Sequence, residues 1–200
     1  MQMPITVTVP LLAFADPEQS ALLRSLLGMA ATAPTAAPKV AEVPGTQPPI
    51  GTYWAGQGGI YVGTAPAFLG MPQRHLIASQ AEKRLTFGPY DHDAAATSHV
   101  DGPANTRALL AEGAKHPAAQ WAAAHTADGH NDFHLPSRMD LLFAYLQAPK
   151  VFDQESWYWS STQVSRNGAF AQHFANGSSG WYGKDGELRV RAFRWIPLTA

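Results

Sequence analysis

The sequence predicts an α+β domain built from short antiparallel strands and two to three helices. Three features indicate this class. Within residues 157–195, short aromatic and β-branched runs are separated by Asn-Gly at 176 and Asp-Gly at 185, pairs that tolerate the positive φ of hairpin turns. Helix-capping residues followed by apolar residues at helical spacing lie within residues 105–147. A proline- and alanine-rich run, residues 30–50, separates this region from a short N-terminal segment.

Composition excludes several kinds of partner and chemistry. The 200 residues, 46% of them apolar, suffice for one domain with a core. The formal net charge is −1 and only 14% of residues are charged, so we expect no nucleic-acid partner. The absence of cysteine removes disulfides, thiolate zinc sites and cysteine nucleophiles. No run reaches the ~18 apolar residues of a membrane helix, so we expect no membrane insertion.

Residues 1–29 are predicted to form a strand–helix module for attachment or oligomerisation. Ile5 to Val9 alternates apolar and polar residues, as a half-buried strand does. A signal peptide is the alternative for the run ending in Ala15, although no Lys or Arg precedes it. Asp16 then caps a helix that Gly28 ends. The apolar stripe of this helix should dock on another chain or a partner protein, and it consists of Leu22, Leu23, Leu26 and Leu27.

Residues 30–50 are predicted to be a stiff, extended linker, since five prolines fall between positions 34 and 49. The main domain is then residues 51–200. Its first strands are Gly51 to Trp54 and Gly59 to Gly63, joined by a glycine-rich turn that lacks the Lys-Ser/Thr of a phosphate loop. His75 to Ala78 is expected to pair with the second of them.

Three helices are predicted in the middle of this domain. Asn105 should cap the first, which Gly113 ends, and Pro117 should start the second, with Trp121 on its buried side. Ser137 and Asp140 form a capping box at the start of the third. The residues of the third helix that we expect to face the core are Leu141, Leu142, Tyr145 and Leu146.

Three motifs carry a family resemblance: residues 132–137 (Asp-Phe-His-Leu-Pro-Ser), residues 158–162 (Tyr-Trp-Ser-Ser-Thr) and residues 189–194 (Arg-Val-Arg-Ala-Phe-Arg). In this order they resemble the Lcl C-terminal domain family, which occurs in bacterial surface adhesins and in phage tail and prophage proteins. The resemblance covers residues 51–198 and implies a C-type-lectin-like fold. The family's Asp-Trp-Arg-Leu-Pro stands here as Asp-Phe-His-Leu-Pro, so its arginine is replaced by His134.

Two loops are rich in metal-binding residue types. One contains Asp91, His92, Asp93 and His99; the other contains His125, Asp128, His130, Asp132 and His134. Neither has His-x-x-x-His on a helix or a cysteine partner, so we expect no zinc and no cofactor. Calcium stays open as an alternative, because a loop of this fold would present hard oxygen ligands from Asp128, Asn131 and Asp132.

An enzyme is the less favoured interpretation. Ser160 and Ser161 have no Gly-x-Ser-x-Gly elbow around them, and the resemblance implies that these hydroxyls serve neighbouring backbone. The formylglycine-generating enzyme of the same fold depends on cysteines, which this chain lacks. Carboxylates at 153, 155, 185 and 187 lie at strand ends or turns without an apolar pocket. No catalytic residue is therefore predicted.

Binding is the favoured function, because aromatic residues alternate with small polar ones between positions 163 and 184, as in adaptable recognition surfaces. The alternative is that Trp181 and Tyr182 only cover the edge of the core. The predicted ligand-binding residues are Gln163, Ser165, Arg166, Asn167, His173, Asn176, Ser178, Ser179, Trp181, Tyr182 and Lys184.

With the resemblance, these features suggest a tail-fibre or tail-tip protein of a phage or prophage virion. It would recognise a bacterial surface glycan or protein and would form a homo-oligomer. Residues 1–29 would join it to other virion proteins. Two alternatives stay open: a structural virion protein, such as a decoration or connector piece without a ligand, and an adhesin domain of the bacterial surface or periplasm.

Overall fold

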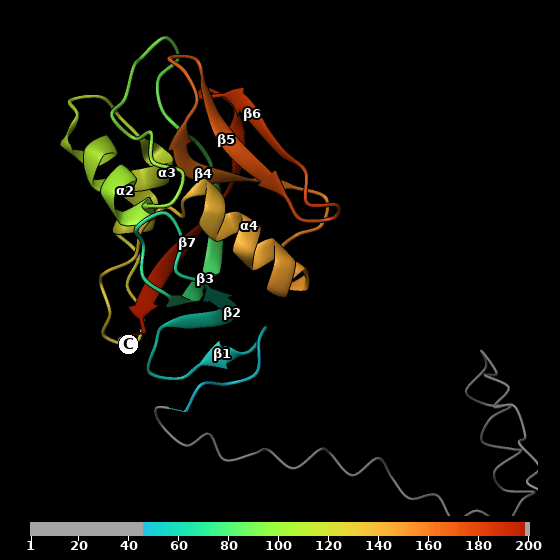
Figure 1. Ribbon diagram of the computed structural model, residues 1–200. Helices are drawn as coiled ribbons and strands as arrows, with labels where there is room; N and C mark the ends of the chain where they lie inside the picture. Colours follow the sequence, from blue (N-terminus) through green and yellow to red (C-terminus); the bar gives the residue numbers. More distant parts are fainter. Residues whose placement is uncertain (1–45, 199–200) are drawn as a thin grey trace, which may run out of the picture. The chain divides into compact units, whose positions relative to one another are not determined.

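The computed structural model describes residues 46–198, in which seven strands form one mixed sheet and three α-helices pack against it (Figure 1). The strands are β1 (Tyr53–Trp54), β2 (Gly59–Ala65), β3 (Arg74–Thr86), β4 (Trp157–Gln163), β5 (Gly168–His173), β6 (Ser179–Gly183) and β7 (Glu187–Pro197). The helices are α2 (Gly102–Ala111), α3 (Pro117–Ala123) and α4 (Arg138–Gln147), followed by the 3₁₀ turn η1 (Pro149–Val151). The predicted module with Leu22, Leu23, Leu26 and Leu27 lies outside the described residues, as does most of the predicted linker.

The strand order in the sheet is β1-β2-β3-β7-β4-β5-β6. All neighbours are antiparallel except β4 and β7, which pair in parallel through Tyr158 and Arg189. The predicted pairing of the first strands is confirmed, since Ile60 lies opposite Ala78. A continuous meander over residues 157–195 was wrong for its last strand. β4, β5 and β6 follow one another, but β7 returns to the middle of the sheet.

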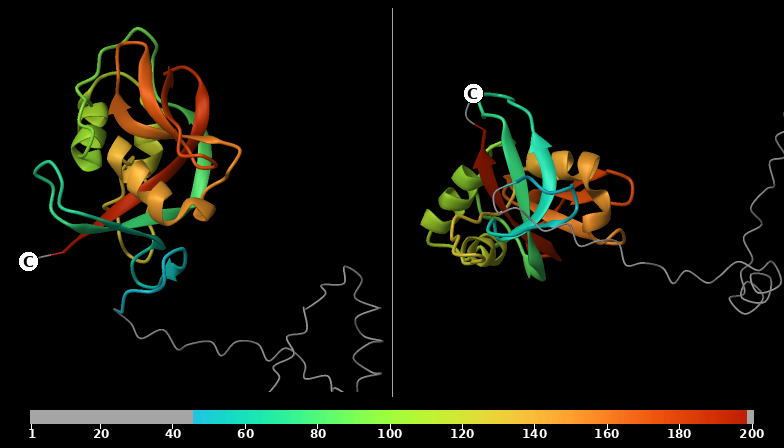
Figure 2. Two further views of the ribbon diagram at one scale, coloured as in Figure 1. Left: turned by 45° about the vertical axis from the view of Figure 1, so that its right-hand side comes forward. Right: turned by 90° about the horizontal axis from the view of Figure 1, so that it is seen from below.

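The middle of the central strand β7 is buried on both faces of the sheet. Val190 and Ala192 belong to one core and Phe193 to the other, as the alternation of side chains along a strand requires. Helices α2 and α3 contribute to the first core and α4 to the second, so the helices lie on opposite sides of the strands (Figure 2).

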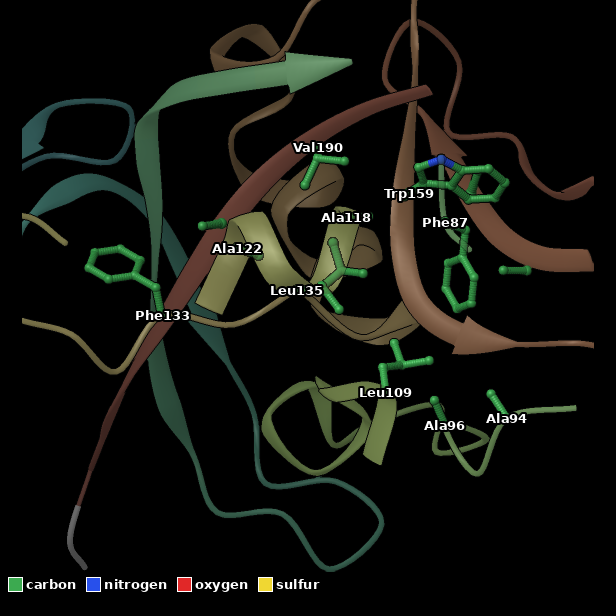
Figure 3. Close-up of a cluster of buried hydrophobic side chains, with 14 residues drawn as sticks. Phe87, Ala94, Ala96, Leu109, Ala118, Ala122, Phe133, Leu135, Trp159 and Val190 are labelled. Atoms are coloured by element: carbon green, nitrogen blue, oxygen red, sulfur yellow. The ribbon is translucent and has the colours of Figure 1, made fainter. Parts of the chain in front are cut away.

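The first core, shown in Figure 3, joins the helix pair α2–α3 to β4, β5 and β7. Trp159 is fully buried in it, its ring lies 5.7 Å from that of Phe87, and its indole N–H donates to the carbonyl of Leu85 over 3.0 Å. The predicted burial of Trp54, Trp159 and Val190 is confirmed. The other buried members of this core are Ala94, Ala96, Leu109, Ala118, Ala119, Ala122, Phe133, Leu135, Ala169, Ala171 and Ala192.

Helix α4 begins at the predicted capping box. The Ser137 hydroxyl accepts from the Asp140 N–H, and the Asp140 carboxylate accepts from the Ser137 N–H. Asp140 also forms a buried ion pair with Arg74 over 2.9 Å. Burial raises the pKa of Asp140, and the neighbouring Arg74 opposes that rise. The expected core position of Leu146 was wrong: its side chain is 65% exposed, and Ala144 is buried instead.

Helix α2 begins earlier than predicted. Asp101 is its N-cap and accepts from the Ala104 N–H over 2.8 Å. Asn105 lies inside the helix, where its side-chain amide binds both backbone groups of Ser98. Because Pro103 lies in the first turn, where a missing N–H costs nothing, the start precedes the predicted cap.

None of the described helices is long and apolar enough to cross a membrane.

Candidate functional site

The predicted ligand-binding residues do not gather in one place. Ser165, Arg166 and Asn167 lie in the loop between β4 and β5, whereas Asn176 and Ser178 lie in the loop between β5 and β6. These loops are at opposite ends of β5, and a six-residue strand spans roughly 20 Å. The predicted set is therefore divided between two surfaces.

Gln163 and Lys184 are buried, which corrects their expected place on a recognition surface. The Lys184 ammonium donates to the carbonyl of His92 over 2.6 Å and also to the side-chain oxygen of Gln163. The amide nitrogen of Gln163 donates to Asp93 over 2.6 Å. Burial lowers the pKa of Lys184, while Asp93 and Glu112 oppose the shift. Both side chains hold the loop before α2 against the sheet.

Trp181 and Tyr182 do not form a single anchor, because neighbouring residues of a strand point to opposite faces. Tyr182 is half-buried and packs against Trp157, with ring centroids 4.8 Å apart. His173 lies on the same side, 5.1 Å from the Trp157 ring. Trp181 is 63% exposed on the other face. Of the two aromatic residues, Trp181 alone offers an open ring.

Trp181 is one end of an aromatic and basic surface that we call the Trp181 strip, made of His99, Arg138, Phe170 and Trp181. Trp181 pairs with Phe170 across β5 and β6. The Arg138 guanidinium lies 4.0 Å from the centre of the Phe170 ring, and His99 meets that ring edge-on at 5.4 Å. Gly168 makes room for Trp181, since a Cβ there would lie 2.9 Å from the indole. Phe170 thus lies between the Arg138 guanidinium and the exposed indole of Trp181.

Backbone contacts fix the strip where the loops meet β4. The Met139 N–H donates to the carbonyl of His99 over 3.0 Å, and the Arg138 N–H donates to the Thr162 hydroxyl over 3.2 Å. The Ser160 hydroxyl donates to the carbonyl of Phe170 over 2.9 Å. The hydroxyls of Ser160 and Thr162 therefore serve neighbouring backbone, although on a strand. The Ser161 hydroxyl instead accepts from the side-chain amide of Asn105 over 3.2 Å.

The first loop of histidines and carboxylates contributes His92 to a cluster that the sequence did not predict. The Nε2 atoms of His92 and His116 lie 2.9 and 3.0 Å from the same carboxylate oxygen of Glu112. The other oxygen accepts from the Ala95 N–H over 3.0 Å. Burial raises the pKa of Glu112, but hydrogen bonds from His92, Ala95 and His116 outweigh it and hold that pKa below its usual value. We call these three side chains the His–Glu–His cluster.

Glu112 and His116 come from elements that surround this loop. Glu112 is the C-cap of α2 and His116 is the N-cap of α3. The spacing of four residues between Glu112 and His116 was the available signal in the sequence. Because these residues lie at a predicted break between two helices, the spacing did not indicate that their side chains would converge. Within residues 46–198, donor atoms of histidine and carboxylate residues converge at this cluster, all within 4.8 Å of one another.

In the second loop, Asp128, His130 and Asp132 each have a separate partner. Asp128 accepts from the N–H groups of Gly56 and Gly58 over 2.8 and 3.1 Å. Asp132 binds Arg194 over 2.6 Å. The predicted calcium ligands Asp128, Asn131 and Asp132 are therefore not grouped as donors in the described residues.

No family model and no curated protein matches the sequence. Among solved structures, a fimbrial protein from Bacteroides ovatus ATCC 8483 is similar, with a TM-score of 0.47 and 16% sequence identity. The match covers 60% of this chain and 35% of the fimbrial chain. At this level the likeness carries no inference about function.

Proposed function

We propose that this protein is a non-enzymatic binding protein of a phage or prophage tail, and that the Trp181 strip contacts a glycan on the bacterial surface. The exposed indole of Trp181 is the observation that carries the proposal. It is 63% exposed on the edge strand β6. An exposed tryptophan gives a large contact area at little cost in side-chain entropy.

The neighbours of Trp181 support a sugar ligand with acidic groups. The Arg138 guanidinium carbon lies over the Phe170 ring, and a guanidinium has five N–H donors with which it can bind a ligand. Arg138 makes no ion pair within residues 46–198, unlike Arg74, Arg166, Arg189, Arg191 and Arg194. A guanidinium in this state can bind a carboxylate in two-point geometry. Indole stacking and a carboxylate contact would then act together.

The assignment to a virion rests on the family resemblance of residues 132–137, 158–162 and 189–194. In this proposal residues 1–29 attach the protein to other tail proteins and hold several copies together. Multiple copies would strengthen weak individual contacts, because linked sites bind with high effective concentration. A decoration protein without a ligand and a bacterial adhesin are the competing assignments.

The test is binding of the purified chain to an array of bacterial surface polysaccharides, both uronic-acid-containing and neutral. We expect binding to at least one acidic polymer. Trp181→Ala should weaken it by about 2 kcal/mol, roughly thirty-fold, since a central aromatic side chain commonly contributes that much. The melting temperature should stay near wild type because the indole is exposed.

Phe68→Ala is the matched control. Phe68 is a 41% exposed aromatic residue in the hairpin between β2 and β3, toward the opposite edge of the sheet from β6. This variant should bind like wild type. If the chain binds no polymer, or if Trp181→Ala binds as tightly as Phe68→Ala, the decoration-protein assignment replaces this one.

A further inference from the structure

The His–Glu–His cluster has the composition and placement of a metal site. Two imidazole nitrogens and one carboxylate oxygen converge within 4.8 Å, and they come from a loop and from the facing ends of two helices. We propose that His92, Glu112 and His116 bind one divalent transition-metal ion of the zinc type, with water in the fourth position. The ion would clamp the loop before α2 onto the junction of α2 and α3.

The distances fit such an ion after a small adjustment. Zinc binds imidazole nitrogen and carboxylate oxygen at about 2.0–2.2 Å, which places tetrahedral ligands roughly 3.3 Å apart. The two nitrogen–oxygen distances here are 2.9 and 3.0 Å. Each nitrogen–oxygen distance therefore needs to change by only a few tenths of an ångström. The two imidazole nitrogens lie within 4.8 Å of each other, and the solvent-facing His92 is the side chain that can adjust this distance. Two histidines and one glutamate are a ligand set that zinc uses when it keeps one position open.

The exposure of the ligands also supports one open position. The side chain of His116 is fully buried, that of Glu112 is 19% exposed and that of His92 is 36% exposed. One side of the cluster therefore faces solvent, where a water ligand can enter. Ca²⁺ and Mg²⁺ prefer oxygen ligands, so the two imidazoles select against them and favour zinc, cobalt or nickel.

Neighbouring groups orient the ligands. The Ala95 N–H holds one oxygen of Glu112 and thereby directs the other toward the two imidazoles. Lys184 holds the backbone carbonyl of His92. Gly88 leaves space for the imidazole of His116, because a Cβ at that position would lie 2.3 Å from Nδ1. The hydrogen bond from Ala95 to the Glu112 carboxylate is of the kind that typically supports a metal ligand, whereas the second ring nitrogen of His116 is buried without a partner among the described residues.

Charge limits the affinity without preventing binding. Lys184 is a nearby cation, and its positive charge repels the metal ion. Its ammonium is already matched by the Gln163 oxygen and by the neighbouring carboxylate of Asp93. Glu112 supplies one negative charge at the ion itself. We therefore expect binding that is weaker than at a closed site with cysteine ligands.

The test uses the full chain without a histidine tag, stripped with EDTA and titrated calorimetrically with ZnCl₂. We expect one ion per chain, visible absorption typical of tetrahedral coordination with Co²⁺, and no heat with CaCl₂. Zinc affinity should fall at acid pH, because imidazole ligands must lose their protons to bind. His92→Ala and Glu112→Gln should each weaken zinc binding at least about tenfold, since even supporting contacts are worth 10–100-fold.

His99→Ala is the matched control, because His99 is exposed and belongs to the same loop. It should bind zinc like wild type. His92→Ala removes only a half-exposed loop side chain, so circular dichroism should show a folded protein. The proposal is overturned if the wild-type chain takes up no zinc, or if folded His92→Ala binds zinc as His99→Ala does.

Discussion

Two loops of this protein resemble each other in residue type but differ in structure. The loop at 88–101 and the loop at 124–134 are both rich in histidine and aspartate. The first brings His92 to Glu112 and His116, so that three donor atoms converge. The second distributes its groups among separate partners: Asp128 binds a glycine turn, and Asp132 binds Arg194.

The difference teaches that residue type in a loop does not decide whether a metal site forms. In the first loop the other two ligands come from helix ends, which two packed helices hold at fixed positions. In the second, the nearest elements offer backbone N–H groups and an arginine, which are donors and not metal ligands. Asp128 therefore serves as an acceptor for the turn at 55–59.

The second loop also ends in a fully buried histidine. The His134 ring lies 5.0 Å from that of Trp195, and neither ring nitrogen has a partner in the described residues. Burial lowers the pKa of His134 to about 3, and the nearby Asp132 opposes the shift. His134 is thus a neutral core side chain.

The largest expected effect is on acid stability at His134. Its pKa is lower in the folded state than the ordinary 6.5, so below pH 6.5 the unfolded chain binds a proton that the folded chain does not. Stability is then lost as the pH falls toward 3. His134→Leu should remove this loss. Between pH 7.5 and 4.5 its free energy of unfolding should fall by about 2–3 kcal/mol less than that of wild type.

Urea denaturation at the two pH values measures this difference. His99→Leu is the control, because it removes a histidine that is exposed and not buried. At pH 7.5, His134→Leu should be tolerated, since an apolar side chain replaces polar atoms without partners. A variant that loses stability in acid as steeply as wild type would show that His134 is protonated in the folded protein.

Local signals in the sequence predicted much of the fold. Ser137 and Asp140 are three residues apart and cap α4 by direct contact, so the motif alone was sufficient. The glycine turn at 56–58 set the hairpin of β1 and β2, because its positive φ angles suit glycine. The burial of Trp159 followed from its size and its strand.

The errors have one physical origin, which is packing between distant segments. Leu146 matches the helical spacing of Leu141 and Leu142, but the partner surface ends before it, and Ala144 is buried instead. β7 lies between β3 and β4 in the sheet, and no local sequence pattern indicates this position.

The candidate sites show the same limit. Tyr182 could have been separated from Trp181 by strand alternation, which the sequence does contain. Glu112 and His116 could not be joined to His92, since 20 residues or more separate them along the chain. Their convergence depends on how α2 and α3 pack on the sheet.

A smaller effect is expected when Asp128 is changed. Its pKa is lowered, above all by the hydrogen bond from Tyr53 and further by the N–H groups of Gly58 and Gly56. A carboxylate with a lowered pKa stabilises the fold at neutral pH, and this contribution is lost as the pH falls below the ordinary 3.8 through the folded value. Asp128→Ala should therefore lower the melting temperature at pH 7.

Asp128→Asn separates charge from backbone strain. The φ of Asp128 is +49°, a conformation that asparagine tolerates and alanine does not, so the melting temperature of Asp128→Asn should fall less. Asp132→Ala removes one ion pair of a 53% exposed carboxylate and should change it least. Equal melting temperatures for all three variants and wild type would mean that the second loop contributes nothing to stability.

The smallest effect is expected from zinc on the second loop. A ligand that binds only the folded state stabilises it according to its own affinity, and changes at sites without shared partners add independently. Zinc should therefore raise the melting temperatures of wild type and Asp128→Asn by the same increment, and that of His92→Ala by little or nothing. The zinc ligands of the first loop and the partners of Asp128 in the second loop have no residue in common, so the two increments in melting temperature should match. A smaller increment in Asp128→Asn, with full response in His92→Ala, would place the ion in the second loop and reverse the comparison.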